Sequence, residues 1–478
     1  MTEHDRSASP QTSSIQQLRA TVNGRVITPG DASFDEARTI FYGGFDRHPA
    51  AIVRVRDASD VSQVVSLARE NGLELAIKSG GHSLAGHSTT DGGIVLDLSE
   101  MKDLQIDVSG RTAWAQTGLT AGEYTAATAA HGLATGFGDT ASVGIGGITL
   151  GGGVGYLVRK HGLTIDDVLA AEIVTADGEL LKVDSESHPE LFWAIRGGGG
   201  NFGVATRFKF RLHKLSSIVG GMLVLPASPE IIASFIAEAQ AAPEELSTIA
   251  NVMVAPPMPF LPQEVHGELI ILAMMVYAGE DVDEGERVIA PFRALAARPI
   301  VDMLKPMSYP EIYPPEEGEY HPTAVGRTMF LDTIKLPEAE TIVEYLSTSE
   351  APMRVAQLRV LGGAMARVGA QATAFAHRSA SIMVNVAAFY EGLEERGVRE
   401  VWAREFEEAL LRQGEGNKGG GVYVSFLGEE GEGRVRDAYP GSTWERLSEI
   451  KGRYDPTNLF RLNHNILPAT GQKETSDG

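Results

Sequence analysis

Short apolar runs separated by polar or glycine-rich stretches characterise the first half of the chain. Such runs predict buried strands at 51–55, 75–77, 93–98 and 112–116. Residues 60–71 have a helical period, with an apolar stripe formed by Val61, Val64, Val65 and Leu67. This spacing predicts a helix that Ser59 or Asp60 caps and that Asn71-Gly72 ends.

A hairpin is the clearest local signal in the region that follows. Residues 171–176 and 179–183 are apolar runs that flank Asp177-Gly178, a dipeptide favoured in tight hairpin turns. Helices are predicted at 121–131 and 190–195, and a strand at 202–212. Because this order of strands and helices is too irregular for a doubly wound parallel sheet, we expect an α+β fold with small mixed sheets.

Strands alternating with longer helices are predicted from about residue 216. The predicted helices span 229–241, 281–295, 338–348 and 400–412. The runs 268–273 and 382–387 are expected to be strands of one antiparallel sheet, and the tail forms a helix followed by a loop at 454–460. The first 15 or so residues are rich in Ser, Thr and Gln and are expected to be disordered.

Composition narrows the class of protein. The 478 residues carry a formal net charge of −22, which argues against nucleic acid or an anionic membrane surface as a partner. The chain has no cysteine, so disulfides, thiolate metal sites and a cysteine nucleophile are excluded. No apolar run approaches the ~18 residues of a membrane span, and the N-terminus has no secretory signal pattern, so a cytoplasmic protein is expected.

Two glycine-rich loops carry the candidate chemistry. The first is KSGGHSLAGH at 78–87, which is open to three interpretations: a metal site, a structural turn, or a loop that a cofactor approaches closely. The second spans 144–155, where seven of twelve residues are glycine. It is either a series of tight turns or a backbone that offers N–H groups to a pyrophosphate. The surrounding pattern does not fit a Rossmann unit, so the pair suggests a dinucleotide bound in another way.

Six segments together resemble one known family. They are KSGGHS with its strand at 75–83, SVGIGGITLGGGVG at 142–155, the run at 156–178, PELFWAIRGGGGNFGV at 189–204, GGAMARVGAQATAFAHR at 362–378 and YDPTNLFRLNHNILP at 454–468. In this order they resemble the flavin-linked oxidases of the vanillyl-alcohol oxidase superfamily. Within it the chain is most similar to the berberine-bridge-enzyme-like group, which includes 6-hydroxy-D-nicotine oxidase.

The resemblance implies a fold and a division of the chain. It implies a PCMH-type FAD-binding module of two subdomains at 34–215, after an N-terminal segment at 1–33. A substrate-binding domain with an antiparallel sheet flanked by helices follows at 216–425, and residues 426–478 return to the FAD-binding domain.

The resemblance also implies that His82 is covalently attached to the 8α-methyl group of FAD. A zinc site is disfavoured, because the nearest companion is His87 in a loop whose one carboxylate is Asp91; we expect no metal. Many relatives have a second, cysteine tether where this chain has Thr140, so a single tether is expected. Val143 favours an oxidase, because a small residue there lets oxygen reach the flavin. The predicted FAD-binding residues are Lys78, Ser79, Gly80, Gly81, His82, Ser83, Thr140, Ser142, Val143, Gly144, Gly146, Gly147, Gly151, Gly152, Gly155, Val204, Asn463 and Asn465.

The catalytic residues are less clear from the sequence. Plant relatives use a glutamate where this chain has Arg367, so that mechanism does not transfer. Sugar-oxidising relatives use a tyrosine near Tyr439, which is the first candidate, and Tyr423 is the second. For both, packing in the core is the alternative. The loop around Tyr313 is either a rim of the substrate entrance or a solvated loop.

The expected function is that of an FAD-dependent oxidase acting on a small molecule. A hydride leaves a C–H bond beside an amine or alcohol, and molecular oxygen is reduced to hydrogen peroxide. The alternatives are a dehydrogenase with another acceptor, an oligosaccharide oxidase, and a flavin-binding protein without enzymatic activity. The sequence leaves the substrate open, and the oligomeric state as either monomer or homodimer.

Overall fold

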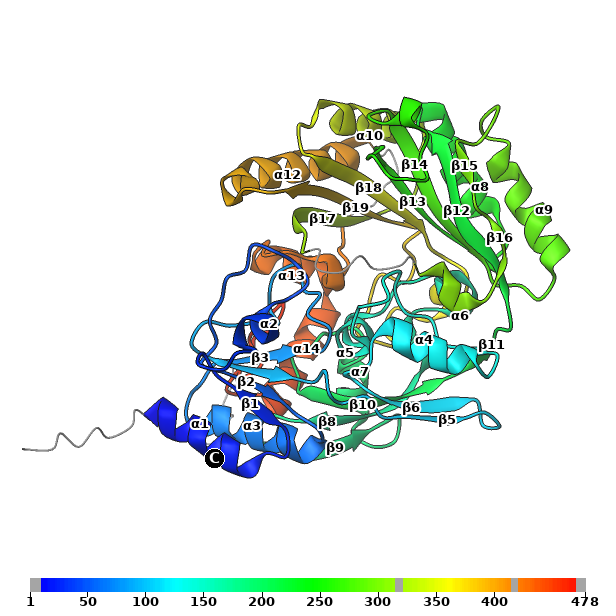
Figure 1. The fold of residues 1–478 in the computed structure, drawn as a ribbon. Helices are drawn as coiled ribbons and strands as arrows, with labels where there is room; N and C mark the ends of the chain where they lie inside the picture. Colours follow the sequence, from blue (N-terminus) through cyan, green and yellow to red (C-terminus); the bar gives the residue numbers. More distant parts are fainter. Residues whose placement is uncertain (1–9, 314–320, 414–419, 470–478) are drawn as a thin grey trace, which may run out of the picture.

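The computed structural model describes residues 10–313, 321–413 and 420–469. Three larger sheets and one two-stranded sheet of the described residues are arranged in two bodies (Figure 1). Two sheets and the C-terminal helices form the lower body in this view, and the third sheet with its helices forms the upper one. The expected α+β class is confirmed.

The first sheet is small and mixed. Its order is β1 (Arg25–Ile27), β2 (Ala51–Arg54), β4 (Ile94–Asp97) and β3 (Leu75–Lys78), with β2, β4 and β3 parallel and β1 antiparallel to β2. Helix α3 (Ala58–Glu70) buries the predicted stripe of valines against this sheet. Its N-cap is Asp57, whose side chain accepts from the Asp60 amide, so the predicted cap at Ser59 or Asp60 was wrong by two or three residues.

The N-terminal segment is more regular than predicted. Helix α1 (Pro10–Thr21) and strand β1 precede Phe34, and Leu18 is fully buried against α3 and the first sheet. The expectation of disorder was therefore wrong for residues 10–15, while residues 1–9 lie outside the described residues. The polar sequence of α1 has one strongly buried leucine rather than an apolar stripe, which is why the pattern did not predict it.

The second sheet is antiparallel throughout. Its order is β5 (Leu104–Asp107), β6 (Thr112–Gln116), β10 (Val204–Arg211), β8 (Val168–Val174) and β9 (Leu180–Val183), and β8–β9 is the predicted hairpin. A two-stranded pair, β7 (Leu133–Ala134) and β11 (His213–Lys214), lies beside it. Besides α1 and α3, the helical segments of this body are α2 (Phe34–Arg38), α4 (Ala121–Ala129), α5 (Ile145–Gly151), α6 (Val158–His161), η1 (Thr164–Asp167), α7 (Pro189–Ala194), α13 (Glu432–Ala438) and α14 (Ser442–Tyr454).

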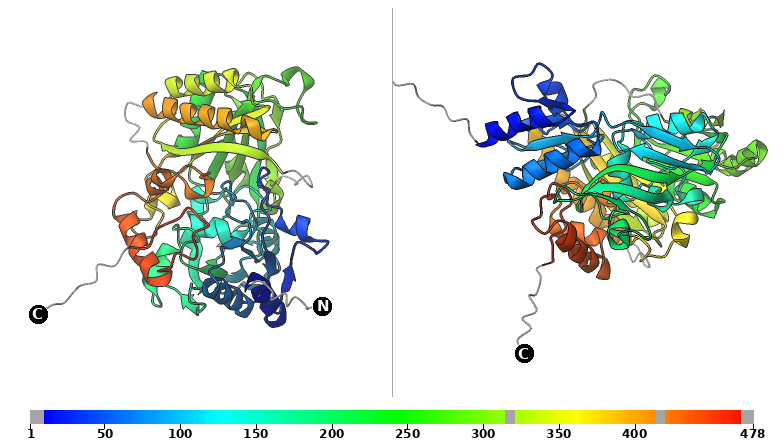
Figure 2. Two further views of the ribbon diagram at one scale, coloured as in Figure 1. Left: turned by 90° about the vertical axis from the view of Figure 1, so that its left-hand side faces the viewer. Right: turned by 90° about the horizontal axis from the view of Figure 1, so that it is seen from below.

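The third sheet is large and antiparallel. Its order is β15 (Val301–Asp302), β12 (Ile218–Pro226), β14 (Leu269–Tyr277), β13 (Leu246–Val254), β18 (Met353–Val360), β19 (Ile382–Tyr390) and β17 (Thr323–Leu331), and β16 (Lys305–Met307) also pairs with β12. Helices α8 (Pro229–Ala241), α9 (Val282–Arg293), α10 (Leu336–Thr348) and α12 (Arg396–Gln413) cover its outer face (Figure 2). Short segments η2 (Gln263–Val265), η3 (Tyr309–Ile312), α11 (Ala364–Arg367), η4 (Leu393–Glu395) and η5 (Val424–Phe426) complete the described elements.

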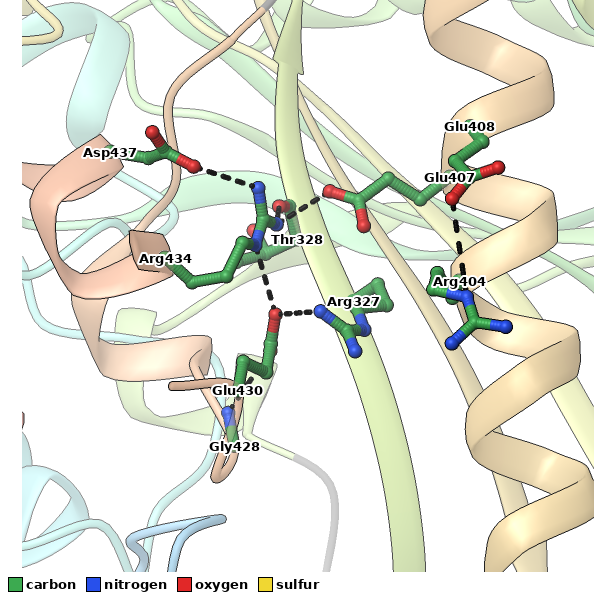
Figure 3. A network of polar contacts seen from close by, with 9 residues as sticks. All are labelled: Arg327, Thr328, Arg404, Glu407, Glu408, Gly428, Glu430, Arg434 and Asp437. Carbon is green, nitrogen blue, oxygen red and sulfur yellow. Dashed lines mark hydrogen bonds and ion pairs between the residues drawn. The ribbon is translucent and has the colours of Figure 1, made fainter. Parts of the chain in front are cut away.

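The C-terminal segment joins the two bodies. Residues between Val422 and Ile466 contribute to the core that also contains the second sheet. On the other side, Arg434 of α13 donates to Glu430, to Glu407 of α12 and to the Thr328 carbonyl of β17 (Figure 3). Arg327 also donates to Glu430, at 2.6 Å. This network of buried and half-buried charges fixes α13 against the third sheet.

Candidate active site

The two glycine-rich loops meet in the structure. A Cβ atom built on Gly80 would lie 2.2 Å from the Gly144 nitrogen, and one on Gly144 would lie 2.3 Å from the Gly80 nitrogen. The two backbones therefore touch, and a side chain at either position would separate them. The loop after β3 and the loop before α5 thus form one site, although more than 60 residues separate them in sequence.

His82 lies at this contact. Its Nε2 atom is 3.0 Å from the Ser142 hydroxyl oxygen, and its ring stacks on Phe41 with centroids 4.0 Å apart. Burial lowers the pKa of His82 to about 4, because the charged form loses its hydration, while a hydrogen bond to the Ser142 backbone raises it. The imidazole is consequently neutral at physiological pH and has a lone pair available for chemistry.

The neighbouring residues of both loops hold the site in place. The Lys78 ammonium donates to the carbonyls of Ala37 and Thr39, and burial lowers its pKa. The Ser79 hydroxyl donates to the Thr117 carbonyl at 2.6 Å.

The Ser83 hydroxyl accepts from the His87 amide at 3.4 Å. Thr140, Ser142 and Val143 are half-buried, and of these three Ser142 is the one that contacts His82. The Val143 carbonyl accepts from the Ala121 amide.

The remaining predicted glycines fall into two groups. Gly147 is exposed and no atom lies within 4 Å of its Cβ position, and Gly146 faces Ser79. Gly151, Gly152 and Gly155 instead pack against other parts of the protein, most tightly at Gly155, where a Cβ atom would overlap a backbone carbonyl. Contact of these three with a cofactor stays a prediction, since packing alone already requires their lack of a side chain.

Gly81 follows strand β3 of the first sheet, whereas Val204 begins strand β10 of the second sheet. Gly81 has φ +73°, which favours glycine, and its carbonyl accepts from the Phe41 amide. Val204 is buried in β10 and pairs with Val174.

The predicted tail residues line a cavity. The Asn463 amide donates to the Gly200 carbonyl at 3.2 Å, and the Asn465 Oδ1 atom is buried without a hydrogen-bond partner among the described residues. Both line a cavity of about 290 Å³ together with His87 and His464, whose rings lie edge to face. Burial lowers the pKa of His87 to about 3 and that of His464 to about 4.

The two tyrosines predicted to be catalytic are deeply buried. The Tyr439 hydroxyl donates to the Gly197 carbonyl at 3.1 Å, and burial raises the pKa of Tyr439 well above its ordinary value. The Tyr423 hydroxyl accepts from the amides of Gly153 and Val154, and burial raises its pKa as well. These contacts are those of residues that support the second glycine-rich loop and the core.

The inner face of the third sheet supplies polar residues that sequence analysis missed. Asn251, Gln357 and Asn385 are neighbours across β13, β18 and β19. Arg359, two residues after Gln357, donates to Asp139 at 2.7 Å and to the Val154 carbonyl. A lone amide inside an apolar strand, as in IMVNVAAFY, was the signal that could have indicated them.

This face lies toward the loop that carries His82. A Cβ atom built on Gly326 of β17 would be 3.5 Å from Asn385 Oδ1 and 3.6 Å from a methyl group of Leu84. Leu84 is two residues from His82. The polar row of the sheet and the histidine thus approach one region between the two bodies.

Two buried tyrosines, Tyr156 and Tyr313, and the half-buried Tyr42 are close enough to Asp139 for its charge to act on them. Burial raises the pKa of Tyr42 and Tyr313 to about 12 and that of Tyr156 further, and the Asp139 charge adds to each effect. Tyr313 packs against Tyr156, so it is a core residue rather than part of a solvated loop. Residues 314–320 of that predicted loop lie outside the described residues.

The part of the chain that the structure describes has neither a candidate metal site nor a membrane-spanning helix. Among residues 10–313, 321–413 and 420–469, no three His, Asp or Glu side chains could hold a metal ion together. Over the same ranges, no helix is long and apolar enough to cross a membrane.

Sequence comparison finds two family profiles in the chain. The FAD binding domain family matches residues 49–184, and the family described as berberine and berberine like matches residues 422–467. (R)-6-hydroxynicotine oxidase from Paenarthrobacter nicotinovorans is 32% identical over 457 residues, which cover 94% of this chain and 97% of that protein.

Solved structures have the same fold. The structure of 6-hydroxy-D-nicotine oxidase from Arthrobacter nicotinovorans matches with a TM-score of 0.83 and 30% identity, over 93% of this chain and 98% of that one. Glucooligosaccharide oxidase from Acremonium strictum, described with a 6-S-cysteinyl, 8α-N1-histidyl FAD, matches with a TM-score of 0.83 at 21% identity, over 96% of this chain and 100% of that one.

Proposed function

The chain belongs to the family of FAD-linked oxidoreductases that includes (R)-6-hydroxynicotine oxidase, and on this basis we propose that it is an oxidase with covalently bound FAD. Its substrate is a small molecule with a C–H bond beside an amine or alcohol, and oxygen is the final electron acceptor. When bound, FAD accepts the hydride and returns two electrons to oxygen as hydrogen peroxide.

The residues of the described site fit an FAD cofactor. Gly147 has open space at its Cβ position, and the backbones of the two loops touch at Gly80 and Gly144. At these three glycines no side chain covers the backbone that a cofactor would approach. Asn465 has a buried carbonyl oxygen without a partner, which an N–H group of a bound ring system could satisfy. We propose that the predicted loop residues from Lys78 to Gly155, together with Val204, Asn463 and Asn465, surround the cofactor.

The observation that carries the covalent link is the state of His82. Its imidazole is neutral and fixed by stacking on Phe41 and by the contact with Ser142. A neutral ring nitrogen is the nucleophile that attachment to the flavin 8α position requires. Thr140 occupies the place of the second tether, and the chain has no cysteine, so the link is single.

The inner face of the third sheet is the proposed platform for the substrate. It carries half-buried amides opposite the loop of His82, where a molecule would lie between the two bodies. Val143 is half-buried in the second glycine-rich loop, next in sequence to Ser142, and it favours reaction with oxygen over a dehydrogenase. Tyr439 and Tyr423 stay predicted proton acceptors. Tyr439 must first give up the hydrogen bond that it donates to the Gly197 carbonyl, whereas Tyr423 accepts its bonds from backbone amides.

Three measurements test the proposal. The purified protein should be yellow, and its flavin should stay with the precipitate in acid. An amine, an alcohol or an oligosaccharide should bleach the flavin anaerobically, and admitted air should restore the colour with release of peroxide. A colourless protein refutes the covalent flavin, and reduced flavin that persists in air for minutes refutes the oxidase in favour of a dehydrogenase.

A further inference from the structure

We propose that Asn251, Gln357 and Asn385 form an amide strip that selects an uncharged hydrogen-bonding group on an otherwise apolar substrate, and that Arg359 is the positioning residue of this strip. The inference rests on the proposed function, because it concerns the substrate of the same site. It adds a substrate class that neither the fold nor the family defines.

Strand register places the three amides side by side. Asn251 is the cross-strand partner of Gln357, and Gln357 is the partner of Asn385. Directly opposed residues of antiparallel strands point to the same face and have Cα atoms about 4.5–5.5 Å apart. All three side chains are half-buried, so they are within reach of a molecule bound on the inner face.

Arg359 fixes the direction of the amides. A guanidinium has donors and no acceptor, so it holds the carbonyl end of Gln357, at 3.0 Å from Nε and 2.7 Å from Nη2. The Gln357 nitrogen then donates to Asn251 Oδ1 at 2.9 Å, and the Asn251 nitrogen donates to the Leu272 carbonyl at 3.3 Å. The described contacts use one N–H of each amide, which leaves the second N–H of each for a ligand.

Asn385 supplies the complementary acceptor. Its Oδ1 atom is buried and has no hydrogen-bond partner among the described residues. Leaving such an atom unpaired costs about 1–3 kcal/mol, so a ligand that donates to it recovers stability. The strip therefore offers N–H donors on Asn251 and Gln357 and an acceptor on Asn385, which is the pattern that a carboxamide or a hydroxyl group matches.

The strip itself carries no net charge. Its nearest charges, Arg359 and Asp139, are paired with each other at 2.7 Å. A carboxylate or ammonium bound to the three amides would lose hydration without gaining a free counterion there. An uncharged polar group avoids this cost.

Apolar residues border the strip on the same face. The half-buried members, on β12, β14 and β18, are Met222, Leu272, Met274, Met353 and Val355. Such a border suits an apolar body. It does not suit an oligosaccharide, whose hydroxyl groups along the whole chain would face methionine and leucine.

Matched probes test the inference on the intact flavoprotein. Benzamide, benzoate and benzylammonium have one shape and differ in charge, and calorimetric titration measures their binding without any turnover. Benzamide should bind about tenfold more tightly than either ion, the size of one well-made hydrogen bond. Asn385→Asp should reverse the order in favour of benzylammonium, and Asn385→Leu should weaken benzamide alone.

The role of Arg359 is tested with a variant that keeps its positive charge and changes its hydrogen-bond geometry. Arg359→Lys keeps the positive charge but cannot hold the Gln357 carbonyl with two donors, so benzamide binding should weaken and KM should rise while kcat stays near its original value. Arg367→Gln, at a surface ion pair with Glu244, is the control and should change neither.

Equal affinities for the three probes, a preference for either ion, or no benzamide binding at millimolar concentration would each overturn the inference. These outcomes are distinct from failure of the proposed function, which is a protein without covalent flavin or without peroxide production.

Discussion

Removal of the Asp139 carboxylate tests whether the ion pair between the two bodies is as desolvated as its geometry indicates. Arg359 is 4% exposed and Asp139 25% exposed, and their atoms are 2.7 Å apart. Asp139→Asn leaves the guanidinium without an opposite charge, because the amide introduced at position 139 is as neutral as the Gln357 and Val154 oxygens that also accept from Arg359. Breaking one side of a buried pair costs about 3–5 kcal/mol, and the partial exposure of Asp139 places the expected loss at the lower end, about 3 kcal/mol.

Glu244→Gln is the matched control. Glu244 pairs with Arg367 at 2.6 Å, but the side chain of Arg367 is 62% exposed, so the expected loss is below about 1 kcal/mol. Urea titration of both variants beside the original protein gives the two free energies of unfolding. Because a chain with two bodies can unfold in steps, two spectroscopic probes should be followed together.

Similar losses of unfolding free energy in the two variants would contradict the prediction. If Asp139→Asn loses no more than Glu244→Gln, the Arg359 pair is solvated and the orientation of the amide strip has no buried anchor. A double variant shows whether the lost stability comes from leaving the Arg359 charge buried without a partner. Asp139→Leu with Arg359→Met removes both charges and should recover most of the free energy of unfolding that Asp139→Asn loses.

Three further predictions concern other residues. His82→Ala should leave no flavin with the acid precipitate, and flavin that remains attached would show that another residue is the tether. Burial lowers the pKa of His87 to about 3 and that of His464 to about 4 in the folded protein. Between about pH 6.5 and pH 4 both imidazoles therefore stay neutral in the folded protein, whereas in the unfolded chain they take up protons. As the pH is lowered from about 6.5 to about 4, the free energy of unfolding should therefore decrease by about 1.4 kcal/mol per pH unit for each histidine. In the His87→Gln, His464→Gln double variant, the free energy of unfolding, measured by unfolding titrations, should depend less steeply on pH. Gly155→Ala should destabilise the protein strongly, because its Cβ would lie 1.3 Å from a backbone carbonyl oxygen, whereas Gly433→Ala, with no atom within 4 Å, should have a thermal midpoint near that of the original protein.

Local signals predicted much of the fold. The β8–β9 hairpin follows from Asp177-Gly178, and α8 was predicted at 229–241, the bounds that the structure gives. These features depend on residues close in sequence. Helix α1 was missed, because its stability comes from burial of Leu18 against distant elements rather than from its own pattern.

The site was only partly accessible from the sequence. The glycines at 80 and 144 marked both loops, because close backbone approach leaves a trace in composition. The amide strip leaves no such trace, since it depends on the register of β13, β18 and β19, which are more than 100 residues apart at the extremes. A single Asn or Gln in a strand gains meaning only once its cross-strand partners are known.

The return of the C-terminal segment to the first body affects biosynthesis. Leu447, Ile450 and Ile466 belong to the same core as Phe208 and Phe210 of the second sheet, and the buried Lys451 donates to the Asn201 carbonyl. While the ribosome is still making the third sheet, this core lacks its last helix and exposes apolar surface. The first body can therefore reach its final packing only after the segment from Leu447 to Ile466 has been made, so synthesis of the first 215 residues does not suffice for its stable folding.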